Sequence, residues 1–331
     1  MLSVICPIYN EEKYIRGCIE SILAQDYPKD DLEVIFADGM STDRTREIVD
    51  GYAARYPWIH LIDNPKRIVP PALNAAIRAS KGDIIMRIDA HAEYAPNYFS
   101  AIAGAHSRLK ADNIGAVCRT EVLGKSKKTL AIREVLAHPL GVGNSAFRTG
   151  ISEEKDVDTV PFGCWRRDVF DKYGLFDERL VRNQDIELSK RILRNGGRIV
   201  IIPETYSTYF ARETFAKLAK NNYGNGLWNI LTVWYTREFN SLSPRHFIPL
   251  IFLLSILLPA IAGLFWHPIW WLAVASLVVY TLAVGVISTK IAIKKHLNSI
   301  YLIMTFFVLH LSYGWGSLFG LLKLPTLKHV K

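Results

Sequence analysis

Three long apolar runs near the end of the sequence constrain its fold more than any other feature. They cover residues 247–266, 269–289 and 299–322, and they contain no Asp, Glu, Lys or Arg. Each is close to the roughly 20 apolar residues with which a helix crosses a bilayer. In the third run, His310 and three glycines also fit a re-entrant segment or a helix-packing face. The pattern predicts a transmembrane region over 247–322, with two or three spans in contact with membrane lipid.

The positive charges around these runs predict their orientation. Only His267-Pro268 separates the first two runs, whereas the link between the second and third contains three lysines between residues 290 and 295. Because cytoplasmic links are rich in Lys and Arg, we expect this second link and the N-terminal part on the cytoplasmic face of the cell (inner) membrane. A basic tail, residues 323–331, would lie on the far side if all three runs span, which keeps the re-entrant alternative open.

The composition indicates two different solvents. Hydrophobic residues make up 50% of the 331 residues, yet the formal net charge is +9. Such a chain fits a water-exposed domain followed by a membrane part. The basic residues are spread along the chain without a nucleic-acid-binding motif, so we expect phosphates or anionic lipid as their partners and no nucleic acid. The four cysteines show no CxxC spacing and are expected to be reduced packing residues.

Ahead of the apolar runs, predicted strands and helices alternate. The strands are expected at Leu2–Cys6, Leu32–Ala37, Ile59–Asp63 and Ile84–Asp89, and the helices at Glu11–Ala24, Thr42–Tyr56 and Pro71–Ser80. This alternation predicts an α/β domain with a doubly wound, mostly parallel sheet. We expect this cytosolic domain to cover residues 1–213. Residues 214–246 are expected to form an amphipathic segment at the membrane interface.

Polar side chains follow each of the four predicted strands. They are Tyr9 and Glu11, Asp38 and Ser41, Asn64 and Arg67, and Asp89 and His91. Any one of them could be a turn residue, but the carboxyl ends of parallel strands meet in one crevice. There, Asp89 and His91 could hold one divalent cation with a phosphate. The sequence contains neither GxGxxG nor a P-loop, which disfavours dinucleotide oxidoreductases and P-loop NTPases.

Four segments resemble, in order, the signatures of family 2 glycosyltransferases with the GT-A fold. They are PIYNEE (7–12), ADGMSTD (37–43), DAH (89–91) and NQDIEL (183–188). Their order makes the match more specific than any one motif. The apolar tail and the wording RIDAH (87–91) are most similar to the membrane-bound succinoglycan biosynthesis type, which is similar to glucosyltransferases that extend a lipid-linked sugar.

The resemblance implies a site for the nucleotide of the sugar donor. Its residues would be Pro7, Tyr9, Glu11, Asp38, Arg67 and Asp89. Within this set, Asp38 would accept a hydrogen bond from the uracil ring, and Asp89 would lie beside the donor sugar and ribose. The implied cofactor is Mn²⁺ or Mg²⁺, bound by Asp89 and by His91 at the last position of the family's DxD. Histidine departs from the commoner Asp and adds no negative charge, which affects metal affinity and choice.

The resemblance also implies a catalytic base and an acceptor side. Asp185 matches the family's base, which an inverting transfer needs on the acceptor hydroxyl. Asp185 could instead cap the helix predicted over Ile186–Asn195. The implied acceptor residues are Gly163, Trp165, Arg166 and Gln184. Of these, Trp165 could equally pack in the core, and Arg166 could start a helix over Asp168–Tyr173.

The function implied is an inverting, metal-dependent hexosyltransferase. It would move a hexose such as glucose from UDP-sugar to a polyprenyl-diphosphate-linked saccharide in exopolysaccharide or cell-surface glycan biosynthesis, within a polysaccharide-assembly complex. A polyprenyl-phosphate glycosyltransferase of the dolichol-phosphate mannose synthase kind is an alternative. Its acceptor is an anionic phosphate that needs no base, so loss of activity in Asp185→Asn would argue against it. A non-catalytic membrane scaffold that binds nucleotide sugar is another. The sequence does not identify the sugar, the linkage or the oligomeric state.

Overall fold

The computed structural model describes residues 1–143 and 145–327, and the chain folds as two compact units. The first unit contains Met1–Arg119 and Ser145–Phe210. The second contains the described residues of Thr120–Asn144 and Ala211–Lys331. The segment from residue 120 to 143 therefore groups with the C-terminal helices, whereas the sequence analysis placed it inside the cytosolic domain. Residues 328–331 of the predicted basic tail lie outside the described residues.

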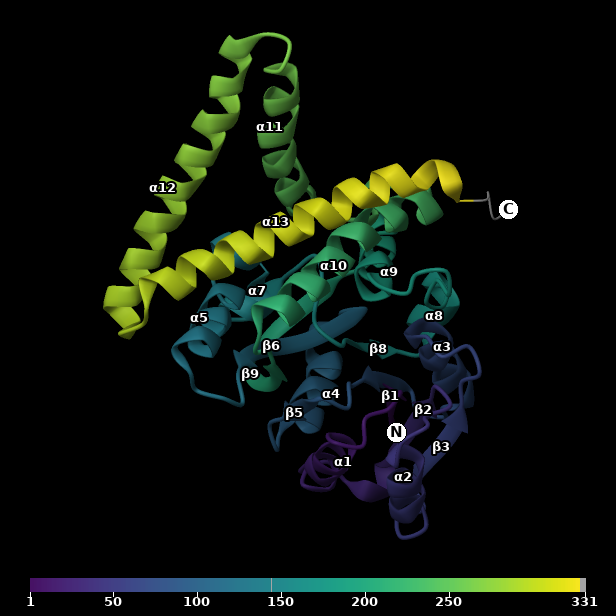
Figure 1. The fold of residues 1–331 in the computed structure, drawn as a ribbon. Helices are drawn as coiled ribbons and strands as arrows, with labels where there is room; N and C mark the ends of the chain where they lie inside the picture. The colour runs from purple at the N-terminus through teal and green to yellow at the C-terminus, as the bar shows by residue number, and fades with distance from the viewer. Residues whose placement is uncertain (144, 328–331) are drawn as a thin grey trace. The chain divides into compact units, whose positions relative to one another are not determined.

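A sheet of nine strands organises the described part of the first unit (Figure 1). Four strands are parallel neighbours in the order β3-β2-β1-β4: β1 (Leu2–Ile8), β2 (Leu32–Asp38), β3 (Ile59–Asp63) and β4 (Ile84–Arg87). The sheet continues through β8 (Cys164–Arg166), β6 (Asn113–Glu121), β9 (Ile199–Phe210) and β5 (Ala92–Tyr94), with β7 (Lys155–Asp156) paired to β9. The predicted α/β class is confirmed, while β8, antiparallel to both β4 and β6, was not predicted.

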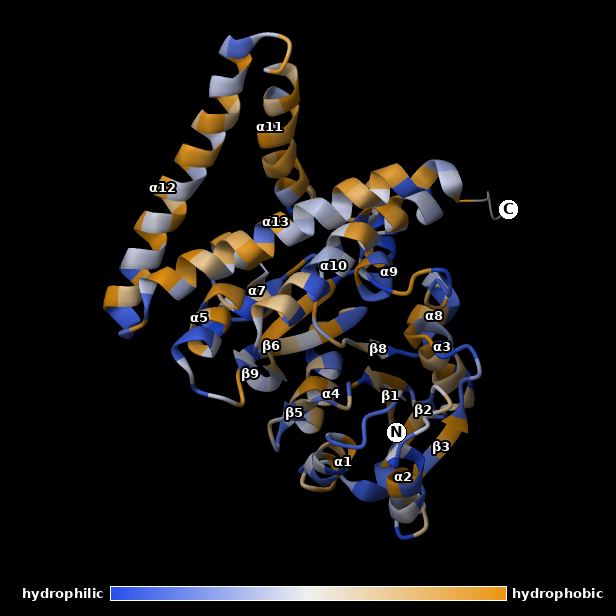
Figure 2. Cartoon of the chain, viewed as in Figure 1, coloured by the Kyte–Doolittle hydropathy of each residue, from blue (hydrophilic) through white to orange (hydrophobic). Residues whose placement is uncertain are grey.

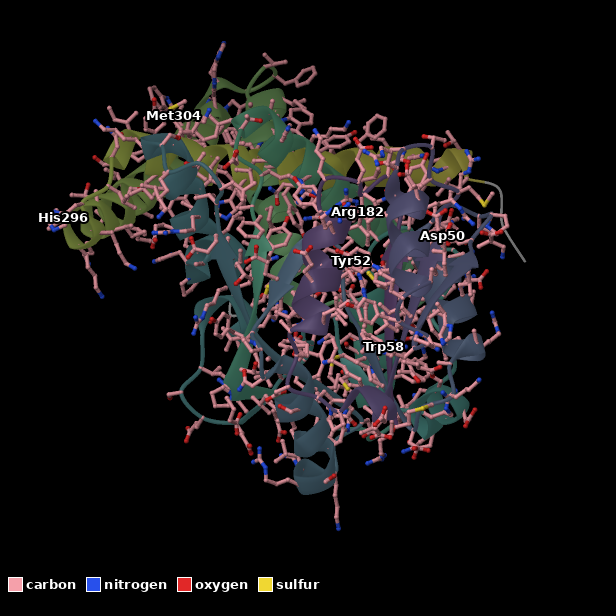
Figure 3. The ribbon with its side chains drawn as sticks, turned by 90° about the horizontal axis from the view of Figure 1, so that it is seen from below. Asp50, Tyr52, Trp58, Arg182, His296 and Met304 are labelled. Atoms are coloured by element: carbon pink, nitrogen blue, oxygen red, sulfur yellow. The ribbon has the colours of Figure 1, made fainter. Side chains whose placement is uncertain are left out.

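Each face of the sheet carries its own core, because successive residues of a strand point to opposite faces. In β1, Val4 and Cys6 pack on one side and Ile5 packs on the other. The first core contains residues of α1 (Ile15–Leu23), α2 (Thr45–Ala53) and α4 (Tyr98–Leu109). The second contains residues of α3 (Val69–Ala79), α8 (Asp168–Tyr173) and α9 (Gln184–Arg194); α7 (Ala146–Thr149) is a single turn. On α2, Tyr52 is buried in the first core and Asp50 is exposed (Figure 3).

The second unit is helical. It contains α5 (Lys127–Leu136), α6 (Pro139–Val142), α10 (Phe215–Thr236), α11 (Ile248–Ala262), α12 (Trp270–Lys295) and α13 (Ser299–Lys323). Short 3-10 helices of this unit occur at Phe239–Ser241, Pro244–Phe247, His267–Ile269 and Leu324–Thr326, and a further one at Lys29–Asp31 belongs to the first unit. In the described residues, three helical segments are long and apolar enough to cross a membrane: Pro244–Ala262, His267–Lys295 and Ser299–Thr326. Figure 2 shows their apolar residues in orange, and they coincide with the three predicted runs.

Candidate active site

A pocket lies at the carboxyl ends of β1, β2 and β4 in the first unit. Seven residues that the sequence proposed line it: Pro7, Tyr9, Glu11, Asn64, Arg67, Asp89 and His91. The rest of its lining is Ile8, Gly39, Ile68, Val69, Ala72 and Arg87. The parallel strands therefore bring the expected polar residues together where loops leave the sheet.

Two loops of the pocket are tied together by hydrogen bonds. Asn10 follows β1 with a φ of 55°, a left-handed conformation that Asn tolerates better than most residues. Its Oδ1 accepts a hydrogen bond of 2.8 Å from the backbone N–H of Thr42. The backbone N–H of Glu11 donates to Thr45 Oγ1 at 2.7 Å. These bonds hold the loop that carries Tyr9 and Glu11 against the loop after β2.

Asp38 supports the pocket from behind and does not line it. Its side chain has no exposed surface. Its Oδ2 accepts hydrogen bonds from Arg46 Nη1 at 2.7 Å and from the backbone N–H of Ser41 at 3.0 Å. Gly39 lines the pocket in its place. In this arrangement the Asp38 carboxylate orders the loop after β2, and its expected contact with a uracil ring stays a prediction.

Arg87, the last residue of β4, is a buried cation beside Asp89. Its side chain is 8% exposed, and its Nε and Nη2 donate to Asp89 Oδ1 at 3.2 and 3.1 Å. Its Nη1 has no hydrogen-bond acceptor within the part of the chain that the structure describes. On the other side of Asp89, His91 Nδ1 lies 3.3 Å from Glu11 Oε1. Charged groups of both signs thus converge at the end of this strand.

Asp185 joins this group from α9. Burial alone would lower the pKa of the Arg87 guanidinium, but the charges of Asp89 and Asp185 more than compensate and raise it above its ordinary value. The helix begins at Gln184, two residues earlier than predicted, so Asp185 lies inside the first turn and not at the cap position, which Asn183 occupies with a φ of 64°. A carboxylate there is favoured by the helix dipole. It is half-buried, as a residue that must meet a substrate can be.

The four residues proposed for the acceptor side separate into two groups. The carbonyl oxygen of Gly163 accepts a hydrogen bond of 3.0 Å from the backbone N–H of Arg87, and buried Gln184 begins α9. Both are therefore adjacent to the charged group. Trp165 is 2% exposed and packs against Phe170 and Phe176, so its ring offers no free face for a sugar.

Arg166 also lies away from the charged group. It is paired in register with Ile84, at the amino end of β4, whereas Asp89 follows the carboxyl end. It forms an exposed ion pair with Asp168. The expected acceptor roles of Trp165 and Arg166 are therefore corrected to core packing and surface pairing.

Comparison with known proteins identifies the chain. The sequence profile of Glycosyl transferase family 2 matches residues 3–174, which include every pocket-lining residue. This chain belongs to glycosyl transferase family 2. A relative from Methanococcus voltae, named dolichyl N-acetyl-alpha-D-glucosaminyl phosphate 3-beta-D-2,3-diacetamido-2,3-dideoxy-beta-D-glucuronosyltransferase, is 26% identical over 332 residues, or 97% of each chain. Succinoglycan biosynthesis protein ExoA of Rhizobium meliloti is 30% identical over 225 residues, or 67% of each.

A solved structure shows the same fold. The mannosyltransferase PcManGT from Pyrobaculum calidifontis, in complex with GDP-Man and Mn²⁺, superposes with a TM-score of 0.61 at 20% identity. The match covers 97% of this chain and 86% of the other. The fold of the family 2 transferase is thus GT-A-like, as its motifs implied.

The side chains that could ligate a metal in this transferase fit a cation that substrate phosphates also ligate. In the residues that the structure describes, no group of three or more His, Cys, Asp or Glu side chains could hold a metal by itself. Asp89 and His91 both line the pocket and supply one carboxylate and one imidazole. Mg²⁺ is commonly held by one or two carboxylates with substrate phosphates, and imidazole also suits transition metals.

Sequence reasoning missed Arg87 as a functional residue. It had appeared only as part of the wording around Asp89, yet it contacts Asp89 and lines the transferase pocket. One signal was available: a charged residue ends the otherwise apolar strand Ile84–Arg87. A buried arginine needs paired carboxylates, and two were already candidates for the site.

Proposed function

We propose that this transferase moves a hexose such as glucose, the sugar that its resemblance to glucosyltransferases implies, from UDP-sugar to a hydroxyl of a polyprenyl-diphosphate-linked saccharide. The transfer inverts the configuration at the anomeric carbon and takes place at the cytoplasmic face of the cell membrane. The observation that carries the proposal is the position of Asp185, whose charge acts on the buried Arg87 of the donor pocket. This position supports the proposed role, because a base for the acceptor hydroxyl has to act beside the bound donor.

The chemistry is a single displacement. Asp185 takes the proton of the acceptor hydroxyl as its oxygen attacks the anomeric carbon, and the bond to the nucleoside diphosphate breaks on the opposite face. The guanidinium groups of Arg87 and Arg67, which both line the pocket, favour the negative charge that collects on the leaving diphosphate. Mn²⁺ or Mg²⁺ held by Asp89 and His91 would supply further neutralisation of that charge.

The relatives support a saccharide hydroxyl as the acceptor. The name of the Methanococcus voltae relative describes a 3-linked transfer to a sugar on dolichyl phosphate, and that relative matches this chain over almost its whole length. A hydroxyl acceptor needs a base, whereas the bare phosphate of the dolichol-phosphate mannose synthase kind does not. The three candidate membrane segments are consistent with a lipid-linked substrate.

The test uses the full chain, purified in detergent, with Mn²⁺ and a panel of UDP- and GDP-sugars. A polyprenyl-diphosphate saccharide and a bare polyprenyl phosphate are offered in parallel, and the lipid products are identified by mass spectrometry. We expect one hexose to be added to the saccharide from a UDP-sugar. We expect Asp89→Asn to lose this product, and Asp168→Asn, a change to an exposed carboxylate outside the pocket, to keep it. A product on the bare phosphate, or donor binding without release of UDP, would support one of the two alternatives instead.

A further inference from the structure

The first half of α13 is packed against α5 and α6. Leu302 and Phe306 of α13 belong to one buried cluster with Ala131 and Val135 of α5. Further along, the ring of His310 is hydrogen-bonded through Nε2 to the carbonyl oxygen at residue 140, at 3.0 Å. One side of this half is therefore covered by protein and not by lipid.

The second half of α13 is packed just as closely against α10. A Cβ added at Gly316 would clash with the carbonyl oxygen of Tyr223, and one added at Gly226 would clash with that of Tyr313. The two helix backbones therefore touch. Figure 1 shows α10 and α13 side by side, and the α11–α12 hairpin rising steeply from the line of α13.

The helices that cover α13, α5 and α10, carry charged side chains, and these charges bear on whether α13 can cross the bilayer. Lys217 and Lys220 of α10 are exposed, and so is Lys127 of α5. If α13 crossed the bilayer, these helices would enter the hydrocarbon with it, and their charges would be costly there. Burial agrees with this: 44% of the apolar window of α13 is buried, against 11% and 17% in the first and second candidate segments.

The uncovered side of α13 is an apolar stripe whose exposed residues lie near the two ends of the helix, while Val308 and Leu311 between them are half-buried. The exposed apolar residues of α13 are Ile300, Met304, Trp315, Phe319, Leu321 and Leu322. At 3.6 residues per turn all of them except Leu321 fall within an arc of about 100°, the width of an interfacial helix face. Met304 is one of the labelled side chains in Figure 3.

We propose that α13 lies in the plane of the membrane interface, with this stripe in the lipid and its other side on α5 and α10, and that α11 and α12 alone cross the bilayer. The stripe is continuous along the chain with the hairpin that enters the same membrane. Two crossings also return Lys323 to the side of Lys294 and Lys295, and leave only His267–Ile269 between the crossings on the far side. That distribution of charge obeys the positive-inside rule, which three crossings break.

Single engineered cysteines test the number of crossings. The four native cysteines are buried, so an impermeant maleimide should report on the added one. We expect Lys323→Cys to be labelled from the same side of sealed vesicles as Lys294→Cys, and His267→Cys from the opposite side. Labelling of Lys323→Cys from the side of His267→Cys would overturn the proposal. The unmodified chain provides the background.

Membrane depth tests the stripe itself. Spin labels are placed on Met304→Cys and Phe319→Cys, both at exposed positions, and on Leu277→Cys within α12 as a deep reference. Their accessibilities to oxygen and to a polar relaxation agent are compared in liposomes. We expect the two α13 sites to be equally shallow. A spanning α13 would place them about 22 Å apart along the helix, so clearly unequal depths would contradict the proposal.

Discussion

Arg87 and Asp89 form a buried ion pair at the end of β4, with Nε and Nη2 of Arg87 both within 3.2 Å of Asp89 Oδ1. Because the backbone N–H of Asp89 also donates to the Tyr94 hydroxyl at 2.8 Å, the carboxylate is held in one orientation. The charge of Asp185 acts on the same guanidinium. Arg87 thus relates the donor side of the site to the candidate base.

Replacing Arg87 by lysine should separate its charge from its geometry. Arg87→Lys keeps the positive charge but loses the planar fork that holds Asp89. We expect kcat for UDP release to fall by about tenfold or more, or about 1.4 kcal/mol of barrier. Arg166→Lys is the matched control, because Arg166 forms an exposed pair outside the pocket. Unchanged kcat and KM in Arg87→Lys would remove this residue from the account.

His91→Asp should restore a stronger metal site. The added negative charge beside Asp89 should tighten binding of Mn²⁺ in the presence of UDP by about tenfold, because carboxylate charge raises the affinity of oxygen-rich cation sites. Titration calorimetry with Mn²⁺ and UDP measures this directly. His60→Asp, on the exposed side of β3, should leave the affinity as it is. Equal Mn²⁺ affinity in His91→Asp and the parent would place the cation elsewhere.

His106 should make the fold sensitive to acid. Burial lowers its pKa from 6.5 to about 4, and its Nε2 lies 3.0 Å from the carbonyl oxygen of Cys164. Between these pH values His106 is protonated in the unfolded chain but stays neutral in the folded chain. The free energy of unfolding therefore falls as the pH drops from about 6.5 to about 4. The loss approaches about 3 kcal/mol.

Denaturant titrations of the detergent-solubilised chain at several pH values measure this loss. His106→Gln can still donate to Cys164 and should flatten the dependence in that window. His60→Gln, at an exposed position, should not. The idea fails if His106→Gln and the parent show the same loss of stability.

The α10–α13 contact should tolerate no added methyl group. Gly316→Ala would press a Cβ against the carbonyl oxygen of Tyr223, and overpacking of this kind costs about 1–3 kcal/mol. Gly285→Ala in α12 is the control, because a Cβ there meets nothing within 4 Å. Thermal unfolding in detergent should show a lower midpoint for Gly316→Ala alone. Equal midpoints in the two variants would show that the helices do not touch.

Local patterns predicted the elements of the nucleotide-binding part well. The apolar runs and the turns between them indicated β1 to β4, and Ile59–Asp63 has the predicted bounds. Seven pocket residues could be expected, because residues that follow parallel strands converge. Long-range pairing could not be predicted in this way. Nothing near Trp165 indicates that its strand lies antiparallel to β4, and that register is what buries the ring and directs Arg166 away from Asp89.

The partners of a helix are also invisible to local patterns. The glycines of the third apolar run suggested a packing face, but the sequence did not show that α10 and α11 cover it. Nor did it show that residues 120–143 belong with the C-terminal helices. Both facts depend on contacts between segments that are far apart in the sequence, and the periodicity of one segment does not predict such contacts.

The most direct test of the account is a single-turnover measurement on Asp185→Asn with the preferred UDP-sugar and lipid-linked saccharide. Removing a general base should lower the rate of transfer by about 10²–10⁴-fold, while the affinity for the donor stays close to that of the parent, because Asp185 does not line the donor pocket. Transfer at the parent rate would contradict the central claim that Asp185 deprotonates the acceptor.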